Sequence, residues 1–117
     1  MEKGFSDTLD EMSRSMKVVE NRFTSNTTIG AVITNGSFTK SQLCKISSMA
    51  HNGFARTIRP VHTSADGDSI YALSTGNVNA DLDTAGSLAA ELMAEAVNRA
   101  VRSSEGGYGY PAACDMR

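Results

Sequence analysis

The spacing of apolar residues divides the chain into segments of different character. Residues 1–26 are polar with scattered apolar positions, and only a short helix around residues 6–15 is expected there. We interpret this segment as a connector. Beyond it, the pattern alternates between the two-residue period of a strand and the 3.6-residue period of a helix.

The first sustained pattern covers residues 27–34 (TTIGAVIT), which are rich in β-branched and apolar side chains. Alternation places Ile29 and Ile33 on one face of a strand and Val32 on the other. Apolar residues on both faces are typical of a strand that is covered on both sides. The Asn-Gly pair at 35–36 is a strong turn signal and predicts the end of this strand.

A helix is predicted next, because Thr39 and Gln42 have the spacing of a capping box. Apolar residues then recur at helical spacing as far as Ile58. We expect the helix to end there, since Arg59 precedes Pro60 and is disfavoured in helical conformation.

The second half of the chain repeats the strand-helix order. Residues 69–75 (SIYALST) predict a second strand, and residues 76–80 predict a turn. Asp83 is the expected N-cap of the last helix. The apolar stripe of that helix comprises Ala85, Leu88, Ala89, Leu92, Met93, Ala96, Val97, Ala100 and Val101.

The order strand, helix, strand, helix indicates an α/β (α+β) fold. Two strands and two helices form only half of a stable layered domain. The sequence therefore predicts that another polypeptide, or a region upstream, covers the strands. Without that cover, we expect residues 27–117 to be poorly soluble or to form a homo-oligomer.

Composition and charge argue against several classes of function. The 117 residues carry a net charge of −2, which gives no basis for binding nucleic acid or an anionic membrane surface. Apolar stretches are too short to span a bilayer, and the N-terminal residues do not resemble a signal peptide. We therefore expect a cytoplasmic protein.

Cysteines and histidines do not indicate a metal or cofactor site. Cys44 and Cys114 are the only cysteines and belong to no CxxC motif or Cys/His cluster, so a disulfide framework or zinc site is not expected. His51 and His62 are eleven residues apart and have no matching third ligand. We interpret them as a helix-surface and a loop histidine, and we predict neither a metal nor a cofactor.

Two short segments are candidates for chemistry: the stretch at 25–30 (SNTTIG) and the Asp66-Gly67-Asp68 triplet. Each is a weak signal alone. Two threonines at the start of a strand usually reflect β-propensity, and Asp-Gly-Asp usually forms a turn.

Together with neighbouring segments, these residues resemble a known family. The ordered series is NTTIG followed by an apolar strand, then GFARTIRPVH at 53–62, then DGDSIYALSTG at 66–76. This series resembles the self-processing aminopeptidases, which include the L-aminopeptidase/D-amidase/D-esterases, the β-aminopeptidases and the nylon-oligomer hydrolases. The similarity runs from about Gly4 to Asp115.

The resemblance implies part of a four-layer αββα sandwich, similar to that of the N-terminal nucleophile hydrolases. It also implies self-cleavage between Asn26 and Thr27, so that 1–26 would end a large subunit and 27–117 would form the small one. Thr27 would be the nucleophile. Its freed α-amine, with an ordinary pKa of about 7.7–8.0, would act as the base.

The same resemblance assigns a role to the acidic pair. Asp68 first, and Asp66 second, would orient the amine and hydroxyl of Thr27 and stabilise the protonated amine. Thr28 and Ser74 are expected to be ordinary strand residues. The implied reaction is hydrolysis of a small peptide or amide through an acyl ester on Thr27.

Two alternatives to a complete hydrolase remain at the level of the sequence. The arginine-pathway N-acetyl transferases also cleave themselves before a threonine. A non-catalytic α/β module that binds a partner through its sheet is the other alternative, because the family's large subunit normally supplies the rest of the active site. The substrate stays open among α-peptides, β-peptides, D-amino-acid amides and aminohexanoate oligomers.

Overall fold

The computed structural model describes residues 7–16 and 26–116 of the chain. Its elements are, in order, α1 (Thr8–Ser15), β1 (Ile29–Gly36), α2 (Lys40–Thr57), β2 (Ser69–Val78), α3 (Leu82–Ser103) and the 3₁₀ helix η1 (Ala113–Met116). The mixed helix-and-strand fold and its predicted order are confirmed. The short helix predicted near residues 6–15 is α1, whereas residues 1–6 and 17–25 of the predicted connector lie outside the described residues.

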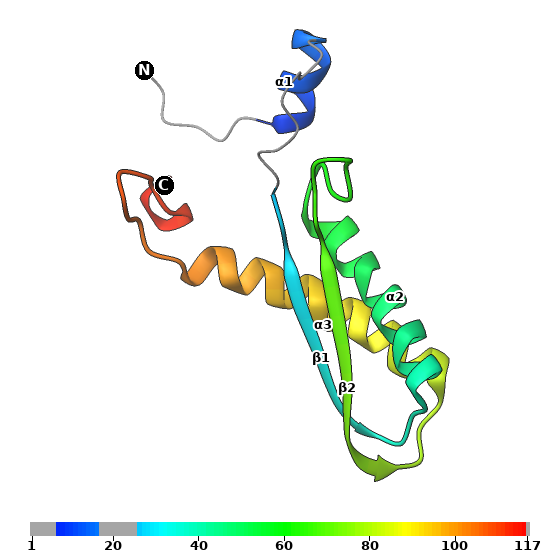
Figure 1. The fold of residues 1–117 in the computed structure, drawn as a ribbon. Coiled ribbons are helices and arrows are strands. Elements are labelled where there is room, and N and C mark those ends of the chain that lie inside the picture. The colour runs from blue at the N-terminus through cyan, green and yellow to red at the C-terminus, as the bar shows by residue number, and fades with distance from the viewer. Residues whose placement is uncertain (1–6, 17–25, 117) are drawn as a thin grey trace.

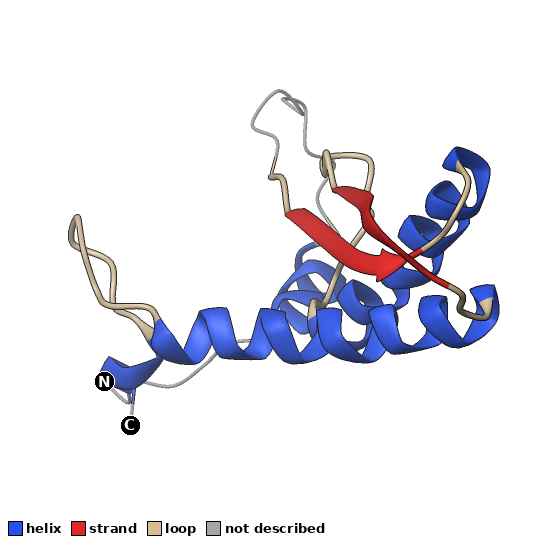
Figure 2. Cartoon of the chain, turned by 90° about the horizontal axis from the view of Figure 1, so that it is seen from below, coloured by secondary structure: helices blue, strands red, loops and turns tan. Residues whose placement is uncertain are grey.

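β1 and β2 form a parallel two-stranded sheet, in which Ile29 pairs with Ser69 and Ile33 pairs with Leu73. Helices α2 and α3 lie on the same side of this sheet, so the described residues form two layers (Figures 1 and 2). A parallel pair needs a crossover connection, and here α2 provides it. Both strands therefore begin at the same end of the sheet.

Both strands continue beyond the ends that the sequence predicts. β1 includes the Asn-Gly pair at 35–36, and β2 runs through the expected turn as far as Val78. The prediction that residues 76–80 turn the chain is therefore wrong for its first part. After a register irregularity, Gly36 pairs with Val78. This added pairing gives hydrogen-bond partners to backbone groups that the sequence had predicted to lie in turns.

The capping box at the start of α2 is confirmed. The Thr39 hydroxyl accepts a hydrogen bond from the Gln42 amide at 3.3 Å, and the Gln42 side chain accepts one from the Thr39 amide at 2.9 Å. The helix ends at Thr57, with Ile58 as its C-cap, as the following Arg59 and Pro60 predict.

The core lies between α2, α3 and the inner face of the sheet. Its centre consists of Ile46, Ala50, Phe54, Ile70, Ala89 and Met93, against which Val32 and Ala72 pack. The two helices approach closely at Gly53, where an added Cβ would lie 2.6 Å from the Ala90 carbonyl oxygen. A larger residue at this position would force the helices apart.

The N-cap of α3 differs from the prediction. Asp81, not Asp83, accepts a hydrogen bond from the Thr84 amide at 2.8 Å, and the helix begins at Leu82. Aspartate is a favourable N-cap at either position, so the local sequence did not distinguish Asp81 from Asp83.

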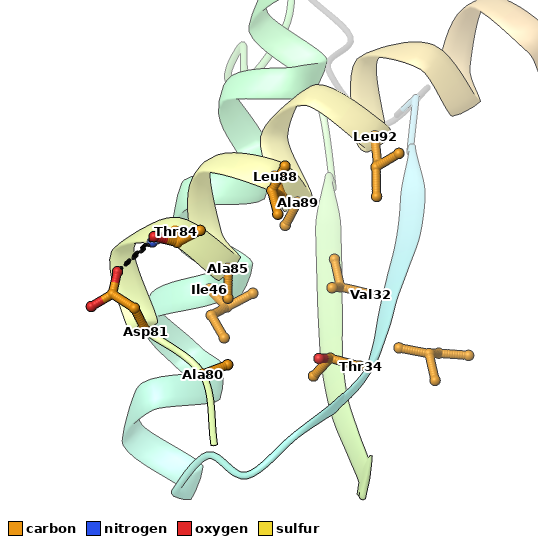
Figure 3. A pocket seen from close by; sticks show the side chains of 11 residues that line it. Val32, Thr34, Ile46, Ala80, Asp81, Thr84, Ala85, Leu88, Ala89 and Leu92 are labelled. Carbon is orange, nitrogen blue, oxygen red and sulfur yellow. Dashed lines mark hydrogen bonds between the residues drawn. The ribbon is translucent and has the colours of Figure 1, made fainter. Parts of the chain in front are cut away.

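The predicted apolar stripe of α3 is only partly buried. Ala89 and Met93 lie in the core, whereas Leu88 and Leu92 are 57% and 63% exposed. An apolar hollow of about 310 Å³ separates these leucines from the free edge of β1 near Val32 and Thr34 (Figure 3). No described helix is both long and apolar enough to cross a membrane.

Candidate active site

The parallel pairing brings the two candidate segments together at the start of the sheet. Asn26 forms an isolated parallel bridge with Asp66, and the Ser69 amide donates to the Thr28 carbonyl oxygen at 3.0 Å. Segments that are forty residues apart in the chain therefore lie side by side at the beginnings of β1 and β2 (Figure 1). All the site residues predicted from the sequence are found in this region.

The junction itself is held by backbone hydrogen bonds. The Asn26 amide donates to the Ala65 carbonyl oxygen at 3.2 Å. The Asn26 carbonyl oxygen accepts a hydrogen bond from the Gly67 amide at 2.8 Å. A backbone N–H therefore points at the oxygen of the peptide bond between Asn26 and Thr27, which polarises that carbonyl group.

Gly67 also lies directly against the Thr27 side chain. A Cβ added to Gly67 would be 2.9 Å from Thr27 Oγ1, a distance that real Cβ atoms essentially never show. The absence of a side chain at 67 therefore makes room for the Thr27 hydroxyl. No role for Gly67 was predicted from the sequence, although its place between the two aspartates was a signal.

Asp68 supports the junction from the inner side of the sheet. Its Oδ1 accepts a hydrogen bond from the Thr28 amide at 3.0 Å, immediately after the candidate nucleophile. Its Oδ2 lies 2.8 Å from His62 Nδ1 and accepts from the His62 amide at 3.3 Å. The Asp68 side chain is only 5% exposed.

These contacts determine the charge state of Asp68. Burial opposes the charged form and would raise the pKa of this carboxyl. The hydrogen bonds from the Thr28 and His62 amides, the His62 ring and the ring's charge act in the opposite direction, so that the pKa of Asp68 lies below its ordinary value. Asp68 is therefore a carboxylate at neutral pH.

Asp66 makes different contacts. Its Oδ2 accepts hydrogen bonds from the Thr63 amide at 2.8 Å and from the Thr63 hydroxyl at 2.7 Å. These bonds close the loop before β2 and position the backbone that bridges to Asn26. The direct role of Asp66 at Thr27 stays a prediction.

Alternation along the strands explains the different surroundings of Thr27 and Asp68. Extending the pairing of Ile29 with Ser69 backward sets Thr27 beside Gly67 and Thr28 beside Asp68. Asp68 then shares the inner face with buried Ile70, whereas Thr27 shares the outer face with exposed Ile29 and is itself exposed. The candidate nucleophile is accessible, and its carboxylate support is buried.

The two histidines lie beneath this site. His62, in the loop as expected, makes an edge-to-face contact with His51, with ring centroids 4.8 Å apart. His51 belongs to α2 and also contacts Phe54, at 5.6 Å. His51 lies on α2 and is partly exposed, as the interpretation of a helix-surface residue predicts, but its Nδ1 is buried and has no hydrogen-bond partner in the described part of the chain.

The comparisons with known proteins agree with the resemblance. Residues 4–111 match the model of peptidase family S58. The chain belongs to this family. It is 38% identical over 106 residues to an uncharacterized aminopeptidase of Mycobacterium leprae (strain TN), an alignment that covers 78% of this chain and 29% of the relative.

Other relatives carry a more specific name. The chain is 30% identical over 90 residues to a 6-aminohexanoate-oligomer endohydrolase of Kocuria sp. (strain KY2), covering 66% of this chain and 25% of the relative. The corresponding protein of Paenarthrobacter ureafaciens is 31% identical over 85 residues, covering 62% of this chain and 24% of the relative. The chain thus spans less than a third of the length of these relatives. No solved structure matches it significantly.

Proposed function

We propose that this chain carries the nucleophile of an amide hydrolase that cleaves itself between Asn26 and Thr27. The observation that carries the proposal is the position of Gly67. Its amide donates to the Asn26 carbonyl oxygen at 2.8 Å, and its Cα leaves space for Thr27 Oγ1. Thr27 would attack the carbonyl carbon while the Gly67 amide stabilises the negative charge that develops on the oxygen.

The steps of this cleavage balance without a cofactor. The Oγ1–C bond forms, the C–N bond between Asn26 and Thr27 breaks, and the hydroxyl proton moves to the Thr27 nitrogen. Water then hydrolyses the ester, which leaves a carboxylate on Asn26 and restores the Thr27 hydroxyl. The new α-amine can accept a proton near neutral pH, which the threonine hydroxyl cannot.

The same groups would serve the hydrolysis of a substrate amide. The Thr27 amine would remove the proton from the Thr27 hydroxyl, directly or through water, and the hydroxyl would form an acyl ester with the substrate. Asp68 would hold the backbone after Thr27 through the Thr28 amide, and Asp66 would secure the loop that carries Gly67. Water would release the acid product.

The names of the relatives favour hydrolysis over acetyl transfer. Both aminopeptidases and 6-aminohexanoate-oligomer endohydrolases act on amide bonds, and we extend this class of substrate to the present chain. A small peptide or amide is the proposed substrate, and a cytoplasmic location is part of the proposal.

We further propose that another polypeptide segment completes the active site and the fold. In the described residues, β1 pairs only with β2, and α3 extends past the free edge of β1 (Figure 1). The hollow beside Leu88 and Leu92 lies where a further strand would continue the sheet (Figure 3). A second sheet on the outer face would produce the four-layer αββα sandwich.

The exposed outer face favours one second candidate function. Ile29 and Ile33 are 71% and 68% exposed, and Tyr71 is 63% exposed, which is typical of a surface that binds a partner. A non-catalytic module would use this face for binding and would not cleave itself.

Intact mass distinguishes the two functions. We expect the 117-residue chain to yield a species that begins at Thr27, and we expect Thr27→Ala to stay uncut. Thr27→Ser should restore cleavage, since serine supplies the same hydroxyl. Thr75→Ala, which removes an exposed strand hydroxyl away from the junction, is the matched control and should cleave like the wild type. Cleavage of Thr27→Ala before residue 27 would refute the nucleophile assignment.

A further inference from the structure

Asp68 depends on one residue for two of its three described hydrogen bonds. Both the backbone N–H and the ring Nδ1 of His62 are directed at Oδ2, at 3.3 Å and 2.8 Å. Oδ1 is thereby left for the Thr28 amide at 3.0 Å. A carboxylate that is 5% exposed needs such partners, because its burial without them is costly.

His62 adopts a conformation that is unusual for a residue with a side chain. Its φ is 56°, in the left-handed region. Residues held in this region are often found at functional sites, where the surrounding structure compensates for the strain. In this conformation, the backbone N–H and the ring Nδ1 of His62 both point at the same oxygen, Asp68 Oδ2.

The His62 ring is tied to the hydrophobic core through α2. It lies edge-on to His51, with centroids 4.8 Å apart, and its centroid is 6.3 Å from that of Phe54. Phe54 is 1% exposed and belongs to the centre of the core. Burial lowers the pKa of His51, and the charge of His62 lowers it further, which favours a neutral His51 ring beneath His62 and Asp68.

We propose that His62 is a positioning residue for Asp68, which in turn fixes the backbone that follows the nucleophile Thr27. His51 and Phe54 hold the His62 ring in place from α2. The proposal rests on the proposed function for its consequence at Thr27, but the contact between His62 and Asp68 is testable without any catalysis.

Two variants of the full chain distinguish the effect of the His62 ring donor from the effect of the backbone conformation at residue 62. Asparagine at 62 places an amide donor near the position of Nδ1 and also tolerates positive φ. Glycine tolerates positive φ equally well but offers no side-chain donor. If His62 acts through its ring donor, His62→Asn should retain the function that His62→Gly loses. Arg56→Gln, which breaks the exposed ion pair with Glu91, is the control for loss of a surface interaction.

The first measurement is the titration of the Asp68 carboxyl carbon by NMR. The titratable groups that face Asp68 among the described residues are His62 from the loop and His51 from α2. All the titrated chains also carry Thr27→Ala, so that cleavage releases no α-amine beside Asp68. We expect the pKa of Asp68 to rise toward the ordinary aspartate value in His62→Gly and to stay close to the wild type in His62→Asn and Arg56→Gln. An unchanged pKa of Asp68 in His62→Gly would overturn the proposal.

The second measurement is the rate at which the species beginning at Thr27 appears. We expect a decrease of about tenfold or more in His62→Gly and at least partial recovery in His62→Asn. Equal losses in both variants would show that the residue acts only through the fold, and would overturn the positioning role. If the wild type did not cleave, the proposed function would fail, while the titration would still decide whether His62 positions Asp68.

Discussion

The two faces of the β1–β2 sheet differ in what covers them. On the inner face, Ile70 is 9% exposed and packs with Phe54 and Met93. On the outer face, Ile33 is 68% exposed. Both faces of the strands carry apolar side chains, so the difference reflects which face the helices of this chain cover. The described residues supply the helices that cover the inner face and leave the outer face exposed.

The candidate active site is divided in the same way. Asp68 faces the core and is held by residues of this chain, whereas Thr27 belongs to the exposed outer face. The groups that would prepare the proposed nucleophile therefore all belong to this chain. The wall that would enclose a substrate would have to come from whatever covers the outer face. The proposed self-cleavage would therefore need fewer groups from a partner than the proposed hydrolysis of a substrate.

A matched pair of substitutions gives the sharpest test of the two faces. Ile70→Ala creates a cavity in the core and should lower the free energy of unfolding by about 2–5 kcal/mol. Ile33→Ala makes the same chemical change on the outer face and should cost less than about 1 kcal/mol. Urea denaturation of the full chain measures both. Similar losses in the two variants would show that the outer face is already covered.

A second test concerns the space that Gly67 leaves for Thr27, the proposed nucleophile. Gly67→Ala should slow the appearance of the species beginning at Thr27 by about 10²-fold, because the added methyl group displaces Thr27 Oγ1 or the loop. That decrease corresponds to about 2.7 kcal/mol in activation free energy.

Gly107→Ala is the matched control for this substitution. A Cβ at Gly107 would meet nothing within 4 Å, and the residue lies in a loop after α3, distant in sequence from the junction. Its cleavage rate should equal that of the wild type. Normal cleavage by Gly67→Ala would contradict the close approach on which the proposed mechanism depends.

The outer face itself provides a third test. If it causes self-association of the isolated chain, Ile33→Ser and Leu73→Ser should each weaken association by about tenfold, since each removes a large exposed apolar group. Sedimentation velocity at several concentrations measures the change. Leu9→Ser, which removes a 50% exposed leucine from α1, is the control. A monomeric wild type would refute the predicted self-association.

Local sequence signals predicted the elements of this fold well. The capping box of Thr39 and Gln42 and the proline at 60 define α2 because their effects act within one helical turn. The alternation of Ile29 and Val32 likewise placed the two faces of β1 correctly. The exposure of Leu92 was not predictable, because the stripe records which face is apolar and not whether a partner is present.

The candidate site could be predicted in its residues but not in its contacts. Asn26, Thr27, Asp66 and Asp68 were identified through the family resemblance, and the parallel pairing brings them together. The contact between His62 and Asp68 depends on a loop conformation with positive φ, for which a histidine is only a weak local signal. Contacts between segments that are distant in sequence are determined by the sheet and the core, and a short motif does not encode either of them.

The smallest expected effect concerns the N-cap of α3, where the sequence favoured the wrong aspartate. Asp81→Ala should lower the melting temperature at pH 7 modestly, whereas Asp83→Ala should have a smaller effect, since only Asp81 accepts from the Thr84 amide and hydroxyl. Hydrogen bonds from Thr84 lower the pKa of Asp81 in the folded chain. A lowered pKa means that the contribution of Asp81 is present above its unfolded value, about 3.9, and is lost as the pH falls through the folded value. The difference in melting temperature between wild type and Asp81→Ala should therefore shrink on acidification below pH ~4. A difference that stayed constant would show that the Asp81 carboxylate is not the cap, and that the helix begins for another reason.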